Sequence, residues 1–391
     1  MYGYQEIVTL LLEYGCDPNG STEIRPLCSA TEYGHTHVAE LLLTHNSDPD
    51  LCDKNNMPPL LIAASFNYSD IAKLLLEKNC DVNLSCKDKK TPLYIASLHN
   101  HIKTVKLLLE YKCNIDICTT NNESPLLVAS QMNHKEIVKL LLENNCDPNI
   151  CNIYNESSLG VAIQEGHPDV VKLLLEYNCD TTWNKRKDTD HDSPLLLALE
   201  SLVVLQRLNT HRTNQYEVVE LLLHNKCDPN ICNEDGQSPL HVAVEKRCSK
   251  LILSLLQGNA NPNLQDKEGR TPLHIALEAN DTESDDTAVD DAESDDTAVD
   301  DAAVDDAESD DTAAYATEAV KLLLEHGADP DIYDNEHCTP LLIASMHGCM
   351  DIIKLLLQYK CSTNICDDDN ELPCIVAYKW GHADIGDLLS L

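Results

Sequence analysis

The fold is decided by residues 124–149, which read SPLLVASQMNHKEIVKLLLENNCDPN. A hydroxyl residue followed by proline predicts a helix start, because the hydroxyl accepts a free backbone N–H and proline fits the first helical position. The leucine block at 137–142 indicates a second helix that packs against helices on both flanks. Asp147-Pro148-Asn149 then predicts the end of that helix and an extended segment. One unit is therefore a helix, a turn, a second helix and a hairpin-like loop.

This unit repeats along the chain. Proline recurs every 33 residues at the start of the pattern, is replaced by Ser158, and later returns after longer gaps. The positions are Pro26, Pro59, Pro92, Pro125, Pro194, Pro239, Pro272, Pro340 and Pro373. A fixed period with a few insertions is typical of a solenoid, in which each repeat contacts only its neighbours. The alanine four residues after each proline is expected to let a neighbouring helix approach closely.

The repeat resembles the ankyrin repeat. The pattern Thr271-Pro272-Leu273-His274-Ile275-Ala276, the pair Gly166-His167, the leucine block and Gly327-Ala328-Asp329 carry this resemblance. It implies an all-α ankyrin solenoid of about eleven helix-turn-helix units joined by β-hairpin-like loops. It also implies a concave groove, lined by hairpin tips and first-helix faces, that binds protein partners.

The expected organisation has four parts. Residues 1–20 form an N-terminal half repeat, because a second helix there has no first helix before it. Residues 21–280 hold ankyrin repeats, 281–314 an acidic low-complexity insertion, and 315–391 the last repeats with a C-terminal cap. The half repeat suggests a fragment of a longer array, or an array that begins with half a repeat.

Several repeats depart from the ankyrin pattern. The histidine of the first motif is present only at His241 and His274, so its hydrogen bonds are missing from most repeats. The sixth repeat lacks the proline and places Gly160 inside a helix, which costs about 1 kcal/mol. We expect this repeat to be the least stable of the ordinary ones.

Two insertions interrupt the period. Near residues 199–216, the first helix is expected to continue through Leu208, followed by a polar loop at 209–214. Residues 281–313 contain sixteen acids and no base; charge repulsion and the absence of large apolar residues predict disorder there. Residues 319–324 should still dock as the second helix of that repeat. For the acidic segment, the alternatives are a duplication without a role, an arm that recruits basic proteins, and cation binding or phosphorylation at Thr287 or Thr297.

The composition indicates which kinds of partner the chain can bind. The formal net charge is −38, which repels nucleic acids and anionic membranes and favours protein partners with basic surfaces. We expect no signal peptide, because the first residues have neither a basic start nor an apolar stretch after it, and the longest apolar run is too short to span a bilayer. We therefore expect a cytoplasmic protein, with a nuclear location as the alternative, reduced thiols and a monomeric state.

No residue pattern indicates catalysis or a cofactor. Cysteines recur with the period at places where other repeats have Ala260 or Ala328, which favours small buried side chains over zinc ligands. His99-Asn100-His101 resembles a nuclease motif but falls in the turn between two helices. Two basic tips, 87–90 and 185–187, are explained as solvated loops, with an acidic partner patch or nuclear import as alternatives.

The predicted function is a non-catalytic scaffold or adaptor that binds a protein along its groove. The alternatives are the recognition part of a larger protein, such as a ubiquitin-ligase adaptor, a channel or a kinase, and a structural spacer. The expected contact residues lie at hairpin tips and on first helices. They are Asn55, Asn56, Phe66, Lys89, His99, Asn122, Gln131, Met132, Tyr154, Asp235, Glu245 and Asn335.

Overall fold

The computed structural model of the protein describes residues 5–21, 24–181, 193–204, 209–278 and 312–390. Every regular element in these ranges is a helix, and the loops between them contain one isolated antiparallel bridge, between Cys151 and Ser157. The chain divides into two compact units. Unit 1 comprises Met1–Thr182 and Leu205–Leu221, and unit 2 comprises Trp183–Val204 and Leu222–Leu391.

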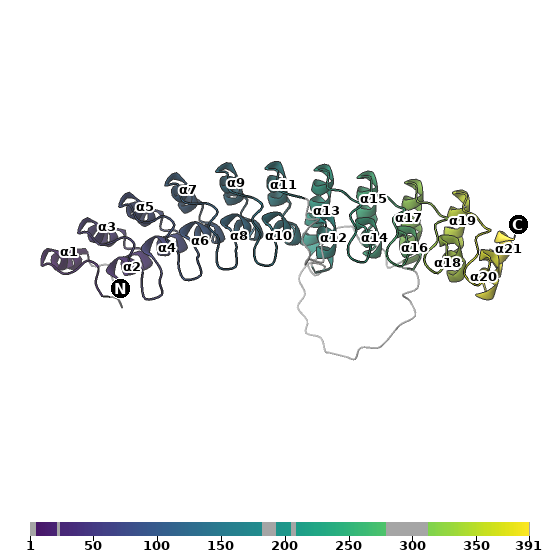
Figure 1. Ribbon diagram of the computed structural model, residues 1–391, viewed down its shortest axis with the longest axis horizontal. Coiled ribbons are helices and arrows are strands. Elements are labelled where there is room, and N and C mark those ends of the chain that lie inside the picture. The colour runs from purple at the N-terminus through teal and green to yellow at the C-terminus, as the bar shows by residue number, and fades with distance from the viewer. Residues whose placement is uncertain (1–4, 22–23, 182–192, 205–208, 279–311, 391) are drawn as a thin grey trace, which may run out of the picture. The chain divides into compact units, whose positions relative to one another are not determined.

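Within each unit, the helices alternate between two rows (Figure 1). The first helices of the repeats are α2 (Pro26–Glu32), α4 (Pro59–Ser65), α6 (Pro92–Leu98), α8 (Pro125–Gln131), α10 (Ser158–Gln164), α12 (Pro194–Val204), α14 (Pro239–Glu245), α16 (Pro272–Glu278), α18 (Pro340–His347) and α20 (Pro373–Lys379). The second helices are α1 (Gln5–Glu13), α3 (Thr36–Thr44), α5 (Ser69–Glu77), α7 (Ile102–Glu110), α9 (Lys135–Glu143), α11 (Pro168–Glu176), α13 (Asn209–His224), α15 (Ser249–Gln257), α17 (Thr312–Glu325), α19 (Met350–Gln358) and α21 (Ala383–Leu389). A first helix such as α6 packs against α4, α8 and α7, which confirms the predicted all-α solenoid.

The first helices begin where the hydroxyl–proline pairs predict. The Thr91 hydroxyl accepts from the backbone N–H of Tyr94 at 3.2 Å, and Ser124 accepts from Leu127 at 3.1 Å. Each hydroxyl therefore satisfies one of the N–H groups that a helix start leaves without an intrahelical partner. Ser157 caps α10 in the same way although no proline follows it.

The core between helices is aliphatic and closely packed. The alanine four residues after the proline is fully buried in Ala63, Ala96, Ala129, Ala243, Ala276 and Ala344. Side chains of this size let adjacent first helices approach each other, as predicted. In the leucine block of α9, Leu141 and Leu142 are buried while Leu140 is half-buried, so the helix is covered on more than one side.

A ladder of polar contacts joins consecutive repeats. After eight of the second helices, an aspartate or asparagine accepts, through its side-chain oxygen, the backbone N–H of the equivalent loop in the next repeat. The pairs are Asn19–Asp48, Asp50–Asp81, Asn83–Asn114, Asp116–Asp147 and Asn149–Asp180 in unit 1, and Asn230–Asn261, Asn263–Asp329 and Asp331–Ser362 in unit 2. These bonds, 2.7–3.0 Å long, fix the register of each repeat on the one before it.

The turns between the two helices of a repeat carry a second set of contacts. A histidine ring there donates to a backbone carbonyl at the end of the preceding first helix. The pairs are His101–Ala64, His134–Leu98, His167–Gln131 and His382–Met346, at 2.7–3.1 Å. In the lengthened repeat, Gln215 takes the place of the histidine and donates to the carbonyl of Ile163 at 2.9 Å.

The insertions are accommodated in different ways. The first helix α12 is longer than its counterparts, as expected; residues 205–208, through which it was predicted to continue, lie outside the described ranges. The predicted loop at 209–214 is wrong, because α13 already begins at Asn209. No glycine or proline occurs between 209 and 214 to stop the helix, and the Gln215 contact anchors it to α10. After the acidic insertion, α17 packs against α15, α16 and α19, which confirms the docking predicted for 319–324; residues 279–311 lie outside the described ranges.

Two glycines inside helices should respond in opposite ways to replacement by alanine, one raising and the other lowering the free energy of unfolding. Gly160 lies in α10 at the place of Leu127 in α8, whereas Gly386 in α21 lies beneath the Tyr378 ring, and a Cβ added there would meet ring carbons at 2.7 Å. Gly160→Ala should therefore raise the free energy of unfolding by about 1 kcal/mol. Gly386→Ala should lower it instead, because the displacement of the Tyr378 ring and the loss of the bond from its hydroxyl to Asp387 outweigh the gain in helix propensity. Urea titrations followed by circular dichroism would measure both, and equal signs would contradict the assignment.

Candidate protein-binding surface

The loop between one repeat and the next ends in a rigid five-residue tip. In the tip at 53–57, the Asp53 carboxylate accepts the backbone N–H of Asn55 at 2.9 Å and of Met57 at 2.7 Å. Asn152, Asn233, Asp266, Asp334 and Asp367 do the same in their tips. The fourth residue has positive φ, which asparagine and glycine tolerate best, as at Asn56 (62°) and Gly236 (78°). The tips therefore present side chains from a fixed backbone.

Neighbouring tips are also bonded to one another. The backbone N–H of Thr120 donates to Asp88 and that of Ile153 to Asn121, both at 3.0 Å. In unit 2, Lys267 donates to Asp235 at 3.0 Å and Asn335 to Glu268 at 2.9 Å. Each unit thus carries an ordered row of tips.

A second exposed row lies at the carboxyl ends of the first helices in unit 1. Tyr33, Phe66, His99 and Met132 occupy equivalent positions at the period of 33 residues. Tyr33, Phe66 and Met132 are 51%, 52% and 46% exposed. An aromatic ring two residues further on stacks beside the first two, His35 beside Tyr33 and Tyr68 beside Phe66. Large apolar side chains that remain in water at regular spacing are candidates for contact with another molecule.

All twelve predicted contact residues are exposed. Asn55, Asn56, Lys89, Asn122, Tyr154, Asp235 and Asn335 lie on tips, and Phe66, His99, Gln131, Met132 and Glu245 lie at the ends of first helices. Two of them also hold the tip row together. The Asn122 side chain donates to the Cys151 carbonyl at 2.6 Å and the Asn335 side chain to the Lys267 carbonyl at 2.8 Å.

Several exposed apolar residues are absent from the contact residues that the sequence predicts. Tyr33 and Trp380, 51% and 60% exposed, end the first helices α2 and α20 in the same position as Phe66. Ile153 and Tyr333, 57% and 49% exposed, lie on or beside tips. The period would have identified Tyr33, because it precedes Phe66 by one repeat.

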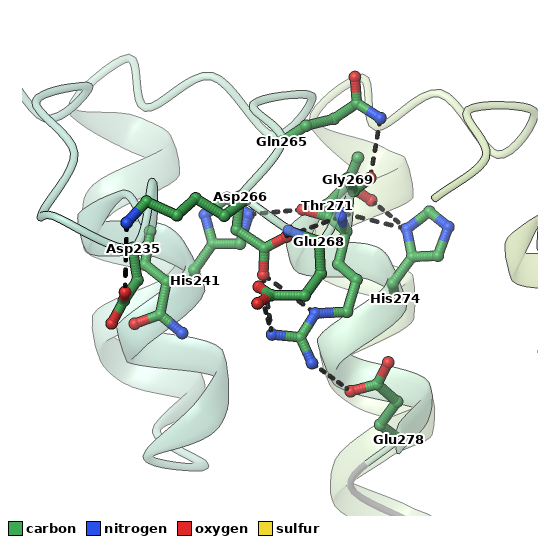
Figure 2. Close-up of polar contacts among 12 residues, drawn as sticks. Asp235, His241, Gln265, Asp266, Glu268, Gly269, Thr271, His274 and Glu278 are labelled. Atoms are coloured by element: carbon green, nitrogen blue, oxygen red, sulfur yellow. Dashed lines mark hydrogen bonds and ion pairs between the residues drawn. The ribbon is translucent and has the colours of Figure 1, made fainter. Parts of the chain in front are cut away.

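One tip in unit 2 is held by ion pairs of Arg270 with three carboxylates, those of Asp266, Glu268 and Glu278, which Figure 2 labels. The guanidinium lies 2.9 Å from Asp266, 3.3 Å from Glu268 and 3.2 Å from Glu278, and the Asp266 side chain is fully buried. Partial burial opposes the charge on Arg270, but the hydrogen bond to Asp266 and the nearby carboxylates raise its pKa. Burial also raises the pKa of the Glu278 carboxyl, against the attraction of Arg270. The network fixes the tip on α16 and neutralises the charge of Arg270.

His241 and His274 are fully buried at the starts of α14 and α16 (Figure 2). In each ring, Nδ1 accepts the backbone N–H of the capping residue, Ser238 or Thr271, at 3.1 Å. Nε2 then donates to a carbonyl of the next tip, Arg270 at 3.0 Å or Cys338 at 3.1 Å. Burial lowers the pKa of both rings. With both nitrogens engaged in the fold, neither ring is placed for acid–base chemistry.

The repeated cysteines are also part of the core. Cys80, Cys113, Cys146, Cys179, Cys227 and Cys361 are buried, like Ala260 and Ala328 at the same position, which confirms their interpretation as small buried side chains. Burial raises the pKa of Cys80 to about 12 and that of Cys113 to about 11, so these thiols stay protonated and weakly reactive. Within the described ranges, no group of three or more metal-binding side chains comes together.

A family model described as ankyrin repeats, in three copies, matches residues 1–86, 78–152, 208–286 and 312–390. The chain belongs to the ankyrin repeat family. Ankyrin repeats are protein–protein interaction modules, and proteins built from them are typically not enzymes. A search of curated proteins found no match to this ankyrin chain. None of its helices, as far as the structure describes them, is long and apolar enough to cross a membrane.

Proposed function

We propose that this ankyrin array is a non-catalytic scaffold or adaptor that binds protein partners through its tips and first-helix ends. The observation that carries the proposal is the pair of exposed rows described above, on a backbone fixed by side-chain and backbone hydrogen bonds. Such a surface loses little conformational entropy on binding. The alternatives are a recognition segment of a larger protein and a spacer.

The charge of the tips predicts different partners for the two units. The four tips of unit 2 that the structure describes, at 233–237, 266–270, 334–338 and 367–371, carry ten acids against two bases. Both bases are paired, Lys267 with Asp235 at 3.7 Å and Arg270 as described. This row therefore suits a partner with a basic surface, and its binding should weaken as salt rises.

The proposal predicts which substitutions abolish binding. Phe66→Ser, Met132→Ser and Tyr154→Ser together should reduce partner recovery from native cell extract by about tenfold or more, because central apolar contacts dominate interface energies. The readout is quantitative mass spectrometry of captured proteins, with circular dichroism to verify folding. The full chain with and without residues 281–313 would be compared to test whether the acidic segment takes part.

A matched control comes from the opposite helix row. Tyr111 and Tyr177, 38% and 39% exposed, end the second helices α7 and α11, and their replacement by serine should leave recovery unchanged. If the control loses the same partners, or the first variant keeps them, recognition does not lie on the tips and first-helix ends.

A further inference from the structure

Two adjacent tips of unit 1 differ in charge from the other tips that the structure describes; the basic tip predicted at 185–187 lies outside the described ranges. The tips at 53–57 and 86–90, here called the lysine tips, carry Lys54, Lys87, Lys89 and Lys90 against Asp53 and Asp88. Lys54, Lys87 and Lys89 are exposed and Lys90 is half-buried. None of the four amines forms an ion pair with a carboxylate that the structure describes, whereas Lys267 and Arg270 on the described tips of unit 2 do.

The acids near the lysine tips are partly engaged elsewhere. The Asp53 carboxylate accepts backbone N–H groups of its own tip. In the following tip, Glu123 accepts the Tyr94 hydroxyl at 2.7 Å and the Thr119 hydroxyl at 3.3 Å. The lysine charges are therefore left facing solvent in a protein of net charge −38.

An apolar strip runs from the lysine tips onto the first helices. Its residues, Met57, Cys86 and Leu98, are half-buried and pack against a buried cluster of Leu61, Tyr94, Ile95 and Val128. Phe66 and His99 lie exposed at the ends of the same two first helices, α4 and α6. Positive charge beside a partly exposed apolar floor matches a ligand that combines acidic and apolar side chains.

We infer that the lysine tips and the apolar strip form a docking site for an acidic segment of a partner protein that carries an apolar anchor residue. The inference rests on the proposed function and names the partner chemistry for unit 1. A nucleic acid fits the observations less well, because its phosphates meet the field of a strongly acidic chain and it offers no aliphatic side chain to the strip. The two units would thus select partner surfaces of opposite charge.

The test is selection of a random displayed peptide library on the immobilised full chain, followed by fluorescence anisotropy with the enriched peptides. The tip variant combines Lys54→Glu, Lys87→Glu, Lys89→Asn and Lys90→Glu. Glu234 and Glu123 occupy the places equivalent to Lys87 and Lys90, and asparagine at Asn56 and Asn122 has the positive φ of Lys89, so these changes suit the fold. The control, Lys73→Glu, Lys103→Glu, Lys106→Glu and Lys139→Asn, makes the same charge change on the second helices of unit 1.

Peptides rich in aspartate and glutamate around a leucine or phenylalanine should be enriched. Their affinity should fall about tenfold or more in the tip variant and stay within about twofold in the control, since local charge decides the encounter and the fit. Enriched peptides that lack acids, or that bind the tip variant equally well, would overturn the inference while leaving the proposed function intact. A library that yields no enrichment would count against both. Tip-dependent binding of a labelled single-stranded oligonucleotide without peptide binding would assign the site to nucleic acid instead.

Discussion

Replacing Leu141 by alanine should lower the free energy of unfolding by about 3 kcal/mol, the usual cost of the cavity left by a fully buried leucine. Leu141 is 0% exposed in α9, a helix that packs against α7, α8 and α11. Because a solenoid is stabilised by contacts between neighbours, the loss should weaken the adjoining repeats as well. Urea unfolding of the full chain, with hydrogen exchange to locate the change, would measure it.

The adjacent Leu140 provides the control. It has the same side chain in the same helix but is only half-buried, so Leu140→Ala should cost about 1 kcal/mol or less. Hydrogen exchange should accelerate in the repeats around α9 and remain unchanged in unit 2. Equal costs for the two substitutions would show that α9 does not pack as described.

His274→Leu should lower the free energy of unfolding by about 2 kcal/mol above neutral pH, because it leaves the buried N–H of Thr271 and the carbonyl of Cys338 without partners. Leucine is the appropriate replacement, since Leu127 and Leu342 hold this place in other repeats and are buried there. Leucine fills a similar volume, so the change in the free energy of unfolding measures the loss of the hydrogen bonds. Thermal and urea unfolding at several pH values would measure it.

The same variant should also remove the part of the pH dependence of the free energy of unfolding that is due to His274. Burial lowers the pKa of His274 below the ordinary value of 6.5, although the Cys338 carbonyl, Asp334 and Asp266 oppose this and Arg270 supports it. The unfolded chain then binds more protons than the native one, so stability is complete above about pH 6.5 and falls as pH decreases towards the lowered pKa. The difference between wild type and His274→Leu should therefore shrink in acid. A difference that stays constant or grows would contradict the neutral state of the buried ring.

The period of the sequence was sufficient to predict most of the fold. A hydroxyl before proline, a small alanine and a leucine block are local signals, and each acts within one repeat. The loop predicted at 209–214 failed because its sequence is polar but contains no helix breaker. Within α13, Gln215 donates to a carbonyl about fifty residues earlier, a contact that no local pattern encodes.

The candidate surface was less predictable. The sequence located the tips, since they fall between predicted helices, and all twelve residues proposed there are exposed. It could not show that the Asn122 side chain joins two tips whereas, in the part of the chain that the structure describes, the Asn55 side chain does not. Nor could it show that three carboxylates surround Arg270 and none of the described carboxylates pairs with Lys89. These differences depend on side-chain positions in neighbouring repeats, and they decide which charges face a partner.

The aspartate and asparagine ladder has a direction with a consequence for synthesis on the ribosome. In every described rung the acceptor side chain precedes its donor, as Asp50 precedes Asp81 and Asn83 precedes Asn114. The turn histidines have the complementary polarity, since His101 donates to the earlier Ala64 carbonyl. Each repeat that emerges thus finds its partner atoms on a repeat that has already been made. Because these contacts join only adjacent repeats, the folded array can lengthen repeat by repeat during translation. Each new repeat also completes contacts of the one before it, such as that of the His241 ring with the Arg270 carbonyl.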